Sequence, residues 1–260
     1  MPYFDNEGVK INYEIEGEGP ELIMIHGFAA SIEINWRLPK WIDVLKGENR
    51  LILVDCRGHG KSDKPKDPAQ YGMKMLEDVV KLMDHLSIKK ANFFGYSMGS
   101  MITLGLLIRE PQLFKSAILG GFVLPSKADQ VTGERASVVA EAFKADSADK
   151  VTTEVGRAFR MFAESTGSDL EALAAVMTAS GGLRDDMVTI EALKNISVPV
   201  MTVVGSDEFL PGDKAAIANI VPRACHFQIQ GRDHLTVVGD SKFHMVVKAF
   251  LNYVNSRSER

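Results

Sequence analysis

The sequence predicts an α/β fold with a mainly parallel sheet, and two observations carry this prediction. Short runs rich in Val, Ile, Leu and Phe recur along the chain, and from Glu21 onward they alternate with segments of helical periodicity. This alternation is typical of strand–helix–strand crossover units, whose sheet is buried on both faces. The 260 residues, 45% hydrophobic and 25% charged, suffice for one substantial core. We therefore expect one domain with a large insertion.

Seven strands are expected in chain order. The first, Val9 to Ile15, alternates apolar and polar residues, so we place it in an antiparallel hairpin at the edge of the sheet. The other six strands are expected at Leu22 to Ile25, Leu51 to Val54, Asn92 to Tyr96, Ala117 to Leu119, Val200 to Val204 and His226 to Ile229. Helices are expected at Trp36 to Leu45, Met73 to Leu86, Ser97 to Arg109, Asp213 to Ile220 and Ser241 to Tyr253. Pro111 is expected to end the third of these helices.

The strand signal disappears between Phe122 and Asn195, where several amphipathic helices are predicted instead. Ser168-Asp169-Leu170-Glu171 has the capping-box pattern that opens a helix. We therefore predict a core of residues 1–121 and 196–260, with residues 122–195 inserted between two core strands as a helical cap.

Charge and hydropathy exclude several classes of partner. The net charge of -4 includes no long basic run, so no nucleic acid partner is expected. No apolar stretch reaches the roughly 20 residues of a membrane span, and the first ten residues lack the apolar core of a signal peptide. We therefore expect a cytoplasmic protein without a membrane span. The sequence leaves monomer and homodimer open.

No metal or organic cofactor is expected either. Cys56 and Cys225 are far apart and outside any metal-type spacing, so we interpret both as reduced thiols. The H-E-x-x-H, G-x-x-x-x-G-K-[ST] and strand-following G-x-G-x-x-G patterns are absent from the sequence. These absences argue against metalloprotease, P-loop and dinucleotide-binding functions.

The strongest chemical signal is Gly95-Tyr96-Ser97-Met98-Gly99, which stands where an apolar strand runs directly into a helix. This is the G-x-S-x-G pattern of a nucleophilic serine in its required context. The sharp turn strains the serine backbone, and the glycines let strand and helix approach closely. Free N–H groups at the helix start favour the anion that forms when a carbonyl is attacked. We therefore predict Ser97 as a nucleophile.

A serine hydroxyl needs a base within hydrogen-bond reach, and six histidines compete for that role. His234 follows the last strand and precedes the final helix, which places it at the carboxyl edge of the sheet, level with Ser97. The acid that orients it should come from the end of the preceding strand, where two carboxylates are adjacent. Asp207 has the expected spacing back from Pro211, whereas Glu208 has the expected spacing forward from Gly205. We predict Asp207, with Glu208 as the alternative.

An oxyanion hole requires two N–H donors. The residue after the nucleophile, Met98, supplies one of them. The turn Ile25-His26-Gly27-Phe28 follows an early apolar strand, and we predict the Phe28 N–H as the second donor, with the Phe28 ring as a wall of the acyl site.

These motifs together resemble the α/β-hydrolase superfamily over nearly the whole chain. The resemblance rests on the His26-Gly27-Phe28 turn, the segment Asp55 to Ser62, the Ser97 elbow, the Asp207 loop and His234. It implies an eight-stranded sheet with a helical lid between strands six and seven, and a structural role for the second motif. Relatives that resemble haloalkane dehalogenases and epoxide hydrolases have an aspartate nucleophile, so Ser97 argues against both reactions.

The expected reaction is therefore acyl transfer from a small-molecule ester through an acyl-enzyme. Lactone hydrolysis, carbon–carbon bond hydrolysis and a small-molecule receptor on the same scaffold are the alternatives. For the substrate pocket we predict a lining of Phe28, Phe122, Leu124 and Met161. We interpret Arg157, Arg160 and Arg184 as solvated charges, with contact to an acidic substrate as the alternative.

Overall fold

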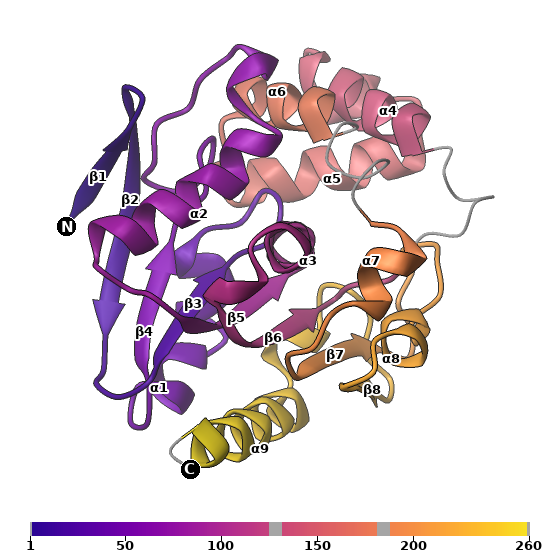
Figure 1. Cartoon of the computed structure of the whole chain (residues 1–260). Helices are drawn as coiled ribbons and strands as arrows, with labels where there is room; N and C mark the ends of the chain where they lie inside the picture. The colour runs from indigo at the N-terminus through magenta and orange to yellow at the C-terminus, as the bar shows by residue number, and fades with distance from the viewer. Residues whose placement is uncertain (1, 125–131, 181–187, 259–260) are drawn as a thin grey trace.

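Eight strands form one sheet in the order β1-β2-β4-β3-β5-β6-β7-β8 (Figure 1). The computed structural model describes residues 2–124, 132–180 and 188–258. The strands are β1 (Tyr3–Asn6), β2 (Val9–Glu16), β3 (Glu21–Ile25), β4 (Arg50–Val54), β5 (Ala91–Tyr96), β6 (Phe114–Gly120), β7 (Val200–Gly205) and β8 (Ala224–Ile229). The pairs β1–β2 and β2–β4 are antiparallel and every other neighbouring pair is parallel. The sequence therefore predicted the mainly parallel sheet and its antiparallel edge correctly.

The outermost strand β1 was not among the seven strands expected from the sequence. It is only four residues long and pairs with β2 through a two-residue turn. Glu7 and Gly8 occupy that turn with φ angles of 53° and 82°. Positive φ at both central positions matches the right-handed twist of a hairpin, and the glycine adopts it without strain.

Helices cover the strands on both sides. They are α1 (Trp41–Leu45), α2 (Met73–His85), α3 (Met98–Arg109), α4 (Thr132–Lys144), α5 (Glu154–Ser165), α6 (Leu170–Ser180), α7 (Ile190–Lys194), α8 (Ala216–Ile220) and α9 (Ser241–Ser258). A π-helical turn spans Glu33–Arg37, and short 3-10 turns span Pro68–Gln70, Pro111–Leu113, Ala148–Lys150 and Val237–Gly239. None of the described helices is long and apolar enough to cross a membrane.

Two predicted helices are divided or begin later than expected, and the last one continues to Ser258 beyond its expected end at Tyr253. The single helix expected from Trp36 to Leu45 is divided into a π-helical turn and α1. Pro39 lacks the N–H that a continuous helix needs, and Lys40 takes the left-handed φ of 66°, so the helix restarts at Trp41. The helix expected from Asp213 begins at Ala216, because the backbone of Asp213 pairs with Leu124 instead.

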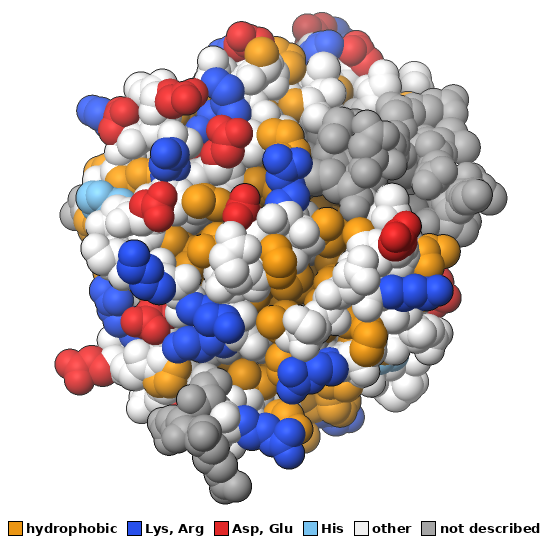
Figure 2. All heavy atoms as spheres, viewed as in Figure 1, with side chains coloured by type: hydrophobic (Ala, Val, Ile, Leu, Met, Phe, Trp, Pro, Cys, Tyr) orange, Lys and Arg blue, Asp and Glu red, His pale blue; other side chains and the backbone are white. Residues whose placement is uncertain are grey.

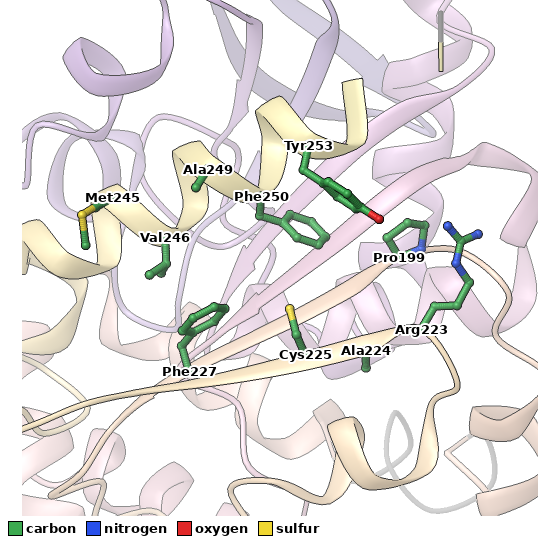
Figure 3. Close-up of a pocket in the computed structure, with 10 residues that line it drawn as sticks. All are labelled: Pro199, Arg223, Ala224, Cys225, Phe227, Met245, Val246, Ala249, Phe250 and Tyr253. Atoms are coloured by element: carbon green, nitrogen blue, oxygen red, sulfur yellow. The ribbon is translucent and has the colours of Figure 1, made fainter. Parts of the chain in front are cut away.

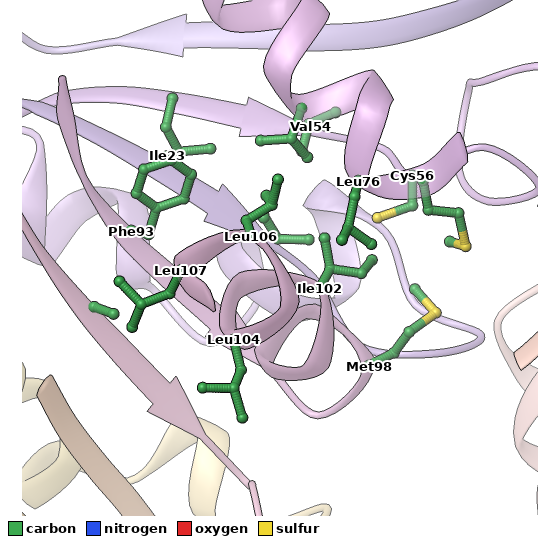
Figure 4. Packing of buried hydrophobic residues seen from close by; sticks show 14 of the residues in the cluster. Ile23, Val54, Cys56, Leu76, Phe93, Met98, Ile102, Leu104, Leu106 and Leu107 are labelled. Carbon is green, nitrogen blue, oxygen red and sulfur yellow. The ribbon is translucent and has the colours of Figure 1, made fainter. Parts of the chain in front are cut away.

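Apolar side chains pack on each face of the sheet. On one face, α2 and α3 contribute Leu76, Ile102 and Leu106 against Ile23 and Phe93 of the strands (Figure 4). On the other face, α1 and α9 enclose a second cluster that includes both tryptophans. Strands β3 to β6 are buried on both faces, which explains their nearly continuous apolar sequences.

Helices α4, α5 and α6 lie together beyond one end of the sheet, between β6 and β7 in the chain (Figure 1). They share a separate apolar cluster that includes Val139, Phe143 and Leu173. Phe28 packs against this cluster and Ala29 belongs to it, although both come from the turn after β3. The α4–α6 group is therefore joined to the core next to the turn predicted to hold an oxyanion. Helix α7 differs, because its Leu193 packs in the main core.

Candidate active site

Ser97 stands between the end of β5 and the first residue of α3, at φ 53° and ψ −111°. Its flanking glycines are required by close backbone approaches. A Cβ on Gly95 would lie 2.2 Å from the carbonyl oxygen of Gly99, and one on Gly99 would lie 1.9 Å from that of Ile25. No side chain fits either space, so the turn can hold Ser97 in this strained position only with glycine on both sides.

A chain of two hydrogen bonds links Ser97 to a buried carboxylate. The Nε2 atom of His234 lies 2.9 Å from the Ser97 Oγ, and its Nδ1 lies 2.8 Å from Oε2 of Glu208. The Glu208 side chain is 0% exposed and that of His234 is 10% exposed. The three residues follow β5, β7 and β8, so the parallel sheet brings them to the same edge. Ser97 and His234 thus meet as the sequence predicted.

The prediction that Asp207 orients His234 is wrong, and Glu208 takes that place. Asp207 is exposed and accepts a hydrogen bond from the Ser206 hydroxyl at 2.7 Å. The loop turns tightly after Gly205, with the Glu208 N–H donating to the Gly205 carbonyl at 3.3 Å, and this turn sends the Glu208 side chain inward. The forward spacing from Gly205 was therefore the correct signal.

The two predicted oxyanion donors lie beside the serine. Within the described ranges, neither the Phe28 N–H nor the Met98 N–H donates a hydrogen bond to a protein acceptor. Met98 opens α3, where first-turn N–H groups have no helical partner. A Cβ on Gly27 would lie 3.4 Å from the Cβ of Ser97, so the Gly27–Phe28 backbone runs directly along the nucleophile.

Asn35 fixes this turn and was missed in the sequence. Its Oδ1 accepts the Gly27 N–H at 2.8 Å, and the residue is only 5% exposed. Asn35 lies in the π-helical turn Glu33–Arg37, a conformation found frequently at functional sites. A polar residue followed by Trp36 in a segment that packs in the core was the available signal.

Tyr96 holds His234 by its backbone. Its hydroxyl donates to the backbone carbonyl of His234, and the two ring centroids are 5.7 Å apart. Burial, with Glu208 nearby, raises the pKa of Tyr96 well above its ordinary value, so the hydroxyl stays a donor. Gly121 leaves room for this contact, because a Cβ there would lie 3.0 Å from the Tyr96 ring and 3.2 Å from the His234 ring.

The two histidines in glycine-bounded turns are structural. His26 accepts the Cys56 N–H on Nε2 at 3.0 Å, and its Nδ1 lies 2.7 Å from the Gly27 carbonyl. His59 Nδ1 lies 3.0 Å from the Arg57 carbonyl. Burial lowers the pKa of His26 and lowers that of His59 to about 3, so both rings are neutral. They brace the turn next to Ser97, and neither ring forms a hydrogen bond to it.

The segment Asp55 to Ser62 carries the structural role that the resemblance implied. Asp55 accepts three hydrogen bonds, from the N–H groups of Ile32 and Lys61 and from the Asn12 amide, at 2.8–2.9 Å. Arg57 forms a buried ion pair with Asp78. The segment thereby ties β2, the turn after β3 and α2 together.

The predicted pocket residues divide into two groups. The Phe28 ring lies 5.8 and 6.0 Å from those of Phe143 and Phe159, at the junction between the core and the α4–α6 group. Phe122 is 7% exposed and packs in the main core, and Leu124 is half-buried. Met161 is 57% exposed and lies away from the buried residues of α5, so the structure does not bring it together with the other three.

Two arginines of α5, Arg157 and Arg160, donate hydrogen bonds to neighbouring backbone. Arg160 is 5% exposed and donates to carbonyl oxygens at the end of α4, those of Ala142, Phe143 and Ala145, at 2.7–3.3 Å. It is therefore a helix-terminating contact, and its interpretation as a solvated charge is wrong. Arg157 is exposed and donates to the Val151 carbonyl. Arg184 lies outside the described residues. Among the described residues, no cluster of three or more His, Cys, Asp or Glu side chains could hold a metal ion.

The family described as the alpha/beta hydrolase fold matches residues 20–216, which include Ser97 and Glu208. The chain belongs to the α/β-hydrolase fold family. A solved enol-lactonase from Burkholderia xenovorans superposes on 96% of this α/β hydrolase and 100% of its own chain, with a TM-score of 0.80 and 23% identity. At that identity the likeness is one of fold.

Curated relatives of this α/β hydrolase act on different substrates. A 2-hydroxymuconate semialdehyde hydrolase from a Pseudomonas species is 36% identical over 117 residues, which are 44% of this chain and 40% of the relative. A 3-oxoadipate enol-lactonase from Acinetobacter baylyi is 31% identical over 138 residues, which are 52% of this chain and 50% of the relative. The aligned part spans half or less of each relative, so these matches carry no assignment of substrate.

Proposed function

We propose that this α/β hydrolase is a serine esterase that cleaves small to medium carboxylic esters, with Ser97, His234 and Glu208 as its catalytic triad. The observation that carries the proposal is the hydrogen-bonded chain from the Ser97 hydroxyl through His234 to the fully buried Glu208. A serine, a base and an orienting acid in this geometry are the requirements for acyl transfer.

In the first half-reaction, His234 Nε2 takes the proton of the Ser97 hydroxyl as its oxygen attacks the ester carbonyl. The N–H groups of Phe28 and Met98 stabilise the oxyanion of the tetrahedral intermediate, each worth about 3 kcal/mol in the transition state. His234 then gives the proton to the leaving alcohol. The product of this half-reaction is an acyl-enzyme on Ser97.

In the second half-reaction, His234 removes a proton from water, which attacks the acyl-enzyme and releases the acid. Glu208 accepts the His234 Nδ1–H in both steps, which keeps Nε2 free as the base and stabilises the charged ring. The Tyr96 hydroxyl and the Glu208 carboxylate bind His234 at opposite ends, one at its backbone and one at its ring. This arrangement lets the base alternate between protonation states without leaving its position.

We propose further that residues 122–195 form a cap over this site, with the core made of residues 1–121 and 196–260. The ring of Phe28, which follows the oxyanion turn, packs between Phe143 of α4 and Phe159 of α5. Thr166, at the end of α5, donates to the Ala29 carbonyl at 2.9 Å. These contacts place Phe28 at the junction between the core and the proposed cap, and we propose a substrate pocket there with Phe28, Phe122 and Leu124 as its lining.

Hydrolysis of lactones is the second candidate. A lactone is a cyclic ester, so the same triad opens it and the leaving alcohol stays attached to the acyl group. The match to an enol-lactonase at 31% identity favours this candidate. The match to a 2-hydroxymuconate semialdehyde hydrolase makes carbon–carbon bond hydrolysis the third outcome to test.

The test is a rate series on p-nitrophenyl esters of increasing acyl length, a set of γ- and δ-lactones, and a ring-fission dienone, with wild type and Ser97→Ala in parallel. We expect ester turnover that falls about a millionfold in Ser97→Ala, as when a triad nucleophile is removed. Faster turnover of lactones or of the dienone would select those functions instead. An unchanged ester rate in Ser97→Ala, or binding without turnover of any substrate, would contradict a serine hydrolase.

A further inference from the structure

Helix α9 carries apolar side chains beyond the face that the core buries completely. Phe243, Val247 and Leu251 recur at helical spacing and are 0% exposed. A second apolar stripe lies beside them and comprises Met245, Val246, Ala249, Phe250 and Tyr253, of which Val246 and Phe250 also pack partly against the core. Met245 is 63% exposed and Tyr253 is 51% exposed. A surface helix with a solvated outer face normally carries charges there, so this stripe indicates a covered surface.

The edge strand β8 continues the same surface. The second stripe of α9 and the nearby side of β8 enclose a groove of about 670 Å³, which Cys225 and Phe227 of β8 line opposite the helix (Figure 3). Phe227 is 40% exposed. Hydrophobic side chains gather on the molecular surface in this region (Figure 2). Arg223 is the one charged residue that lines the groove among the described residues, and its guanidinium donates to the Ser197 carbonyl.

The backbone of β8 is open as well. In the described part of the chain β8 pairs with β7 alone, so its outer N–H and C=O groups have no strand partner. Edge strands are normally protected by Lys, Pro or inward-pointing charges, and Ala224–Ile229 contains none of these. Antiparallel pairing with an identical strand satisfies both edges at once, because two-fold symmetry repeats every contact between residues i and j as a contact between j and i.

The exposed apolar area around the groove can be compared with the area that a stable dimer interface buries. With about 200 Å² for each complete side chain, Phe227, Met245 and Tyr253 alone expose about 300 Å². A stable interface buries about 800 Å² on each partner, and the strand edge and the other groove residues add to the three side chains. Among the described residues the groove lining includes no acidic or lysine side chain, and the cations at the groove are Arg223 and Arg257, whose guanidinium lies 4.8 Å from the centroid of the Tyr253 ring.

We propose that β8 and α9 form the interface of a two-fold symmetric homodimer, in which the two β8 strands pair antiparallel and the two apolar grooves close on each other. This inference does not depend on the proposed ester hydrolysis, because the surface is separate from Ser97 and His234.

Sedimentation velocity over a range of concentrations tests the proposal with wild type, Phe227→Glu and Met245→Glu. Tyr3→Glu is the matched control, because Tyr3 is 46% exposed on β1, the opposite edge of the sheet. We expect wild type and Tyr3→Glu to sediment at about twice the chain mass of 28.6 kDa. Each of the other two variants should weaken association at least 100-fold, since each brings two unpaired carboxylates into the interface. Unchanged thermal unfolding monitors the fold.

A monomeric wild type at all concentrations would overturn the proposal, as would a dimer that both groove variants leave intact. Cys225 gives an independent measurement, because Cys56 is buried and Cys225 is exposed. In the dimer a maleimide should label Cys225 of wild type much more slowly than Cys225 of Phe227→Glu, because the closed groove covers the thiol. Equal labelling rates in a preparation that sediments as a dimer would place the interface elsewhere.

Discussion

The variant Glu208→Gln is the sharpest test that Glu208, and not Asp207, orients His234. Both Glu208 oxygens accept hydrogen bonds, Oε2 from His234 Nδ1 at 2.8 Å and Oε1 from the Leu210 N–H at 2.9 Å. In Glu208→Gln the remaining oxygen is held by the Leu210 N–H, so the new NH₂ faces Nδ1. A donor at that position forces the ring proton onto Nε2, which then cannot accept the proton of Ser97.

The expected loss in kcat is about 10⁴-fold, the scale found when a triad acid becomes an amide, which corresponds to about 5 kcal/mol of transition-state stabilisation. Asp207→Asn is the matched control. Asp207 is exposed and touches only Ser206 and the loop backbone, so its kcat should stay within about threefold of wild type. Both variants are assayed on the best p-nitrophenyl ester, with thermal unfolding as a check of the fold. A larger loss in Asp207→Asn, or Glu208→Gln retaining a tenth of the activity, would refute the assignment.

Three further predictions concern the surroundings of the triad. Tyr96→Phe removes the donor to the His234 carbonyl, so kcat should fall about tenfold with KM unchanged, and an equal change in both would contradict a positioning role. Asn35→Ala frees the Gly27 N–H and should lower kcat by about 10- to 100-fold through the oxyanion turn, whereas full activity would exclude that role. The buried, neutral His59 has a pKa of about 3 against about 6.5 unfolded, so its contribution is complete above pH 6.5 and declines as the pH falls toward 3. The free energy of unfolding is measured from urea titrations between pH 7 and 4. Its fall with decreasing pH should be less steep in His59→Gln than in wild type, by about 1.4 kcal/mol per pH unit, and equal slopes would contradict this.

The sheet could be predicted because seven of its eight strands are recognisable from their own sequences. The apolar runs of β3 to β7 are continuous, since these strands are covered on both faces, and such runs need no knowledge of their neighbours. The antiparallel start was likewise visible in the alternation of β2. Strand β1 escaped because four residues are too few to establish a period, and its position is fixed by pairing with β2.

The position of Ser97 could be predicted because the reactive side chain and the glycines that its turn requires lie in one short segment. Ser97 needs glycines at fixed positions because two backbones approach within contact distance, and this requirement is written in the motif itself. The choice between Asp207 and Glu208 is different, since a one-residue difference in a loop decides which side chain turns inward. That direction is set by contacts with residues 231–234, in which the Asp207 N–H donates to the Arg232 carbonyl. Sequence spacing alone left both carboxylates open.

Side chains whose role depends on a partner from a distant segment were the hardest to predict. Arg160 has the composition of a solvated charge, yet three carbonyl groups at the end of α4 bury its guanidinium. Met161, its neighbour, has the composition of a pocket residue and faces outward, because α5 turns Arg160 and Ala163 toward the other helices. Adjacent residues of a helix point in different directions, so Arg160 is buried and the next residue, Met161, is exposed. An apolar residue in an amphipathic helix therefore indicates a pocket only when it is known which face of the helix is buried. On α5 the buried face includes the charged residue Arg160, which the sequence pattern alone would place in solvent.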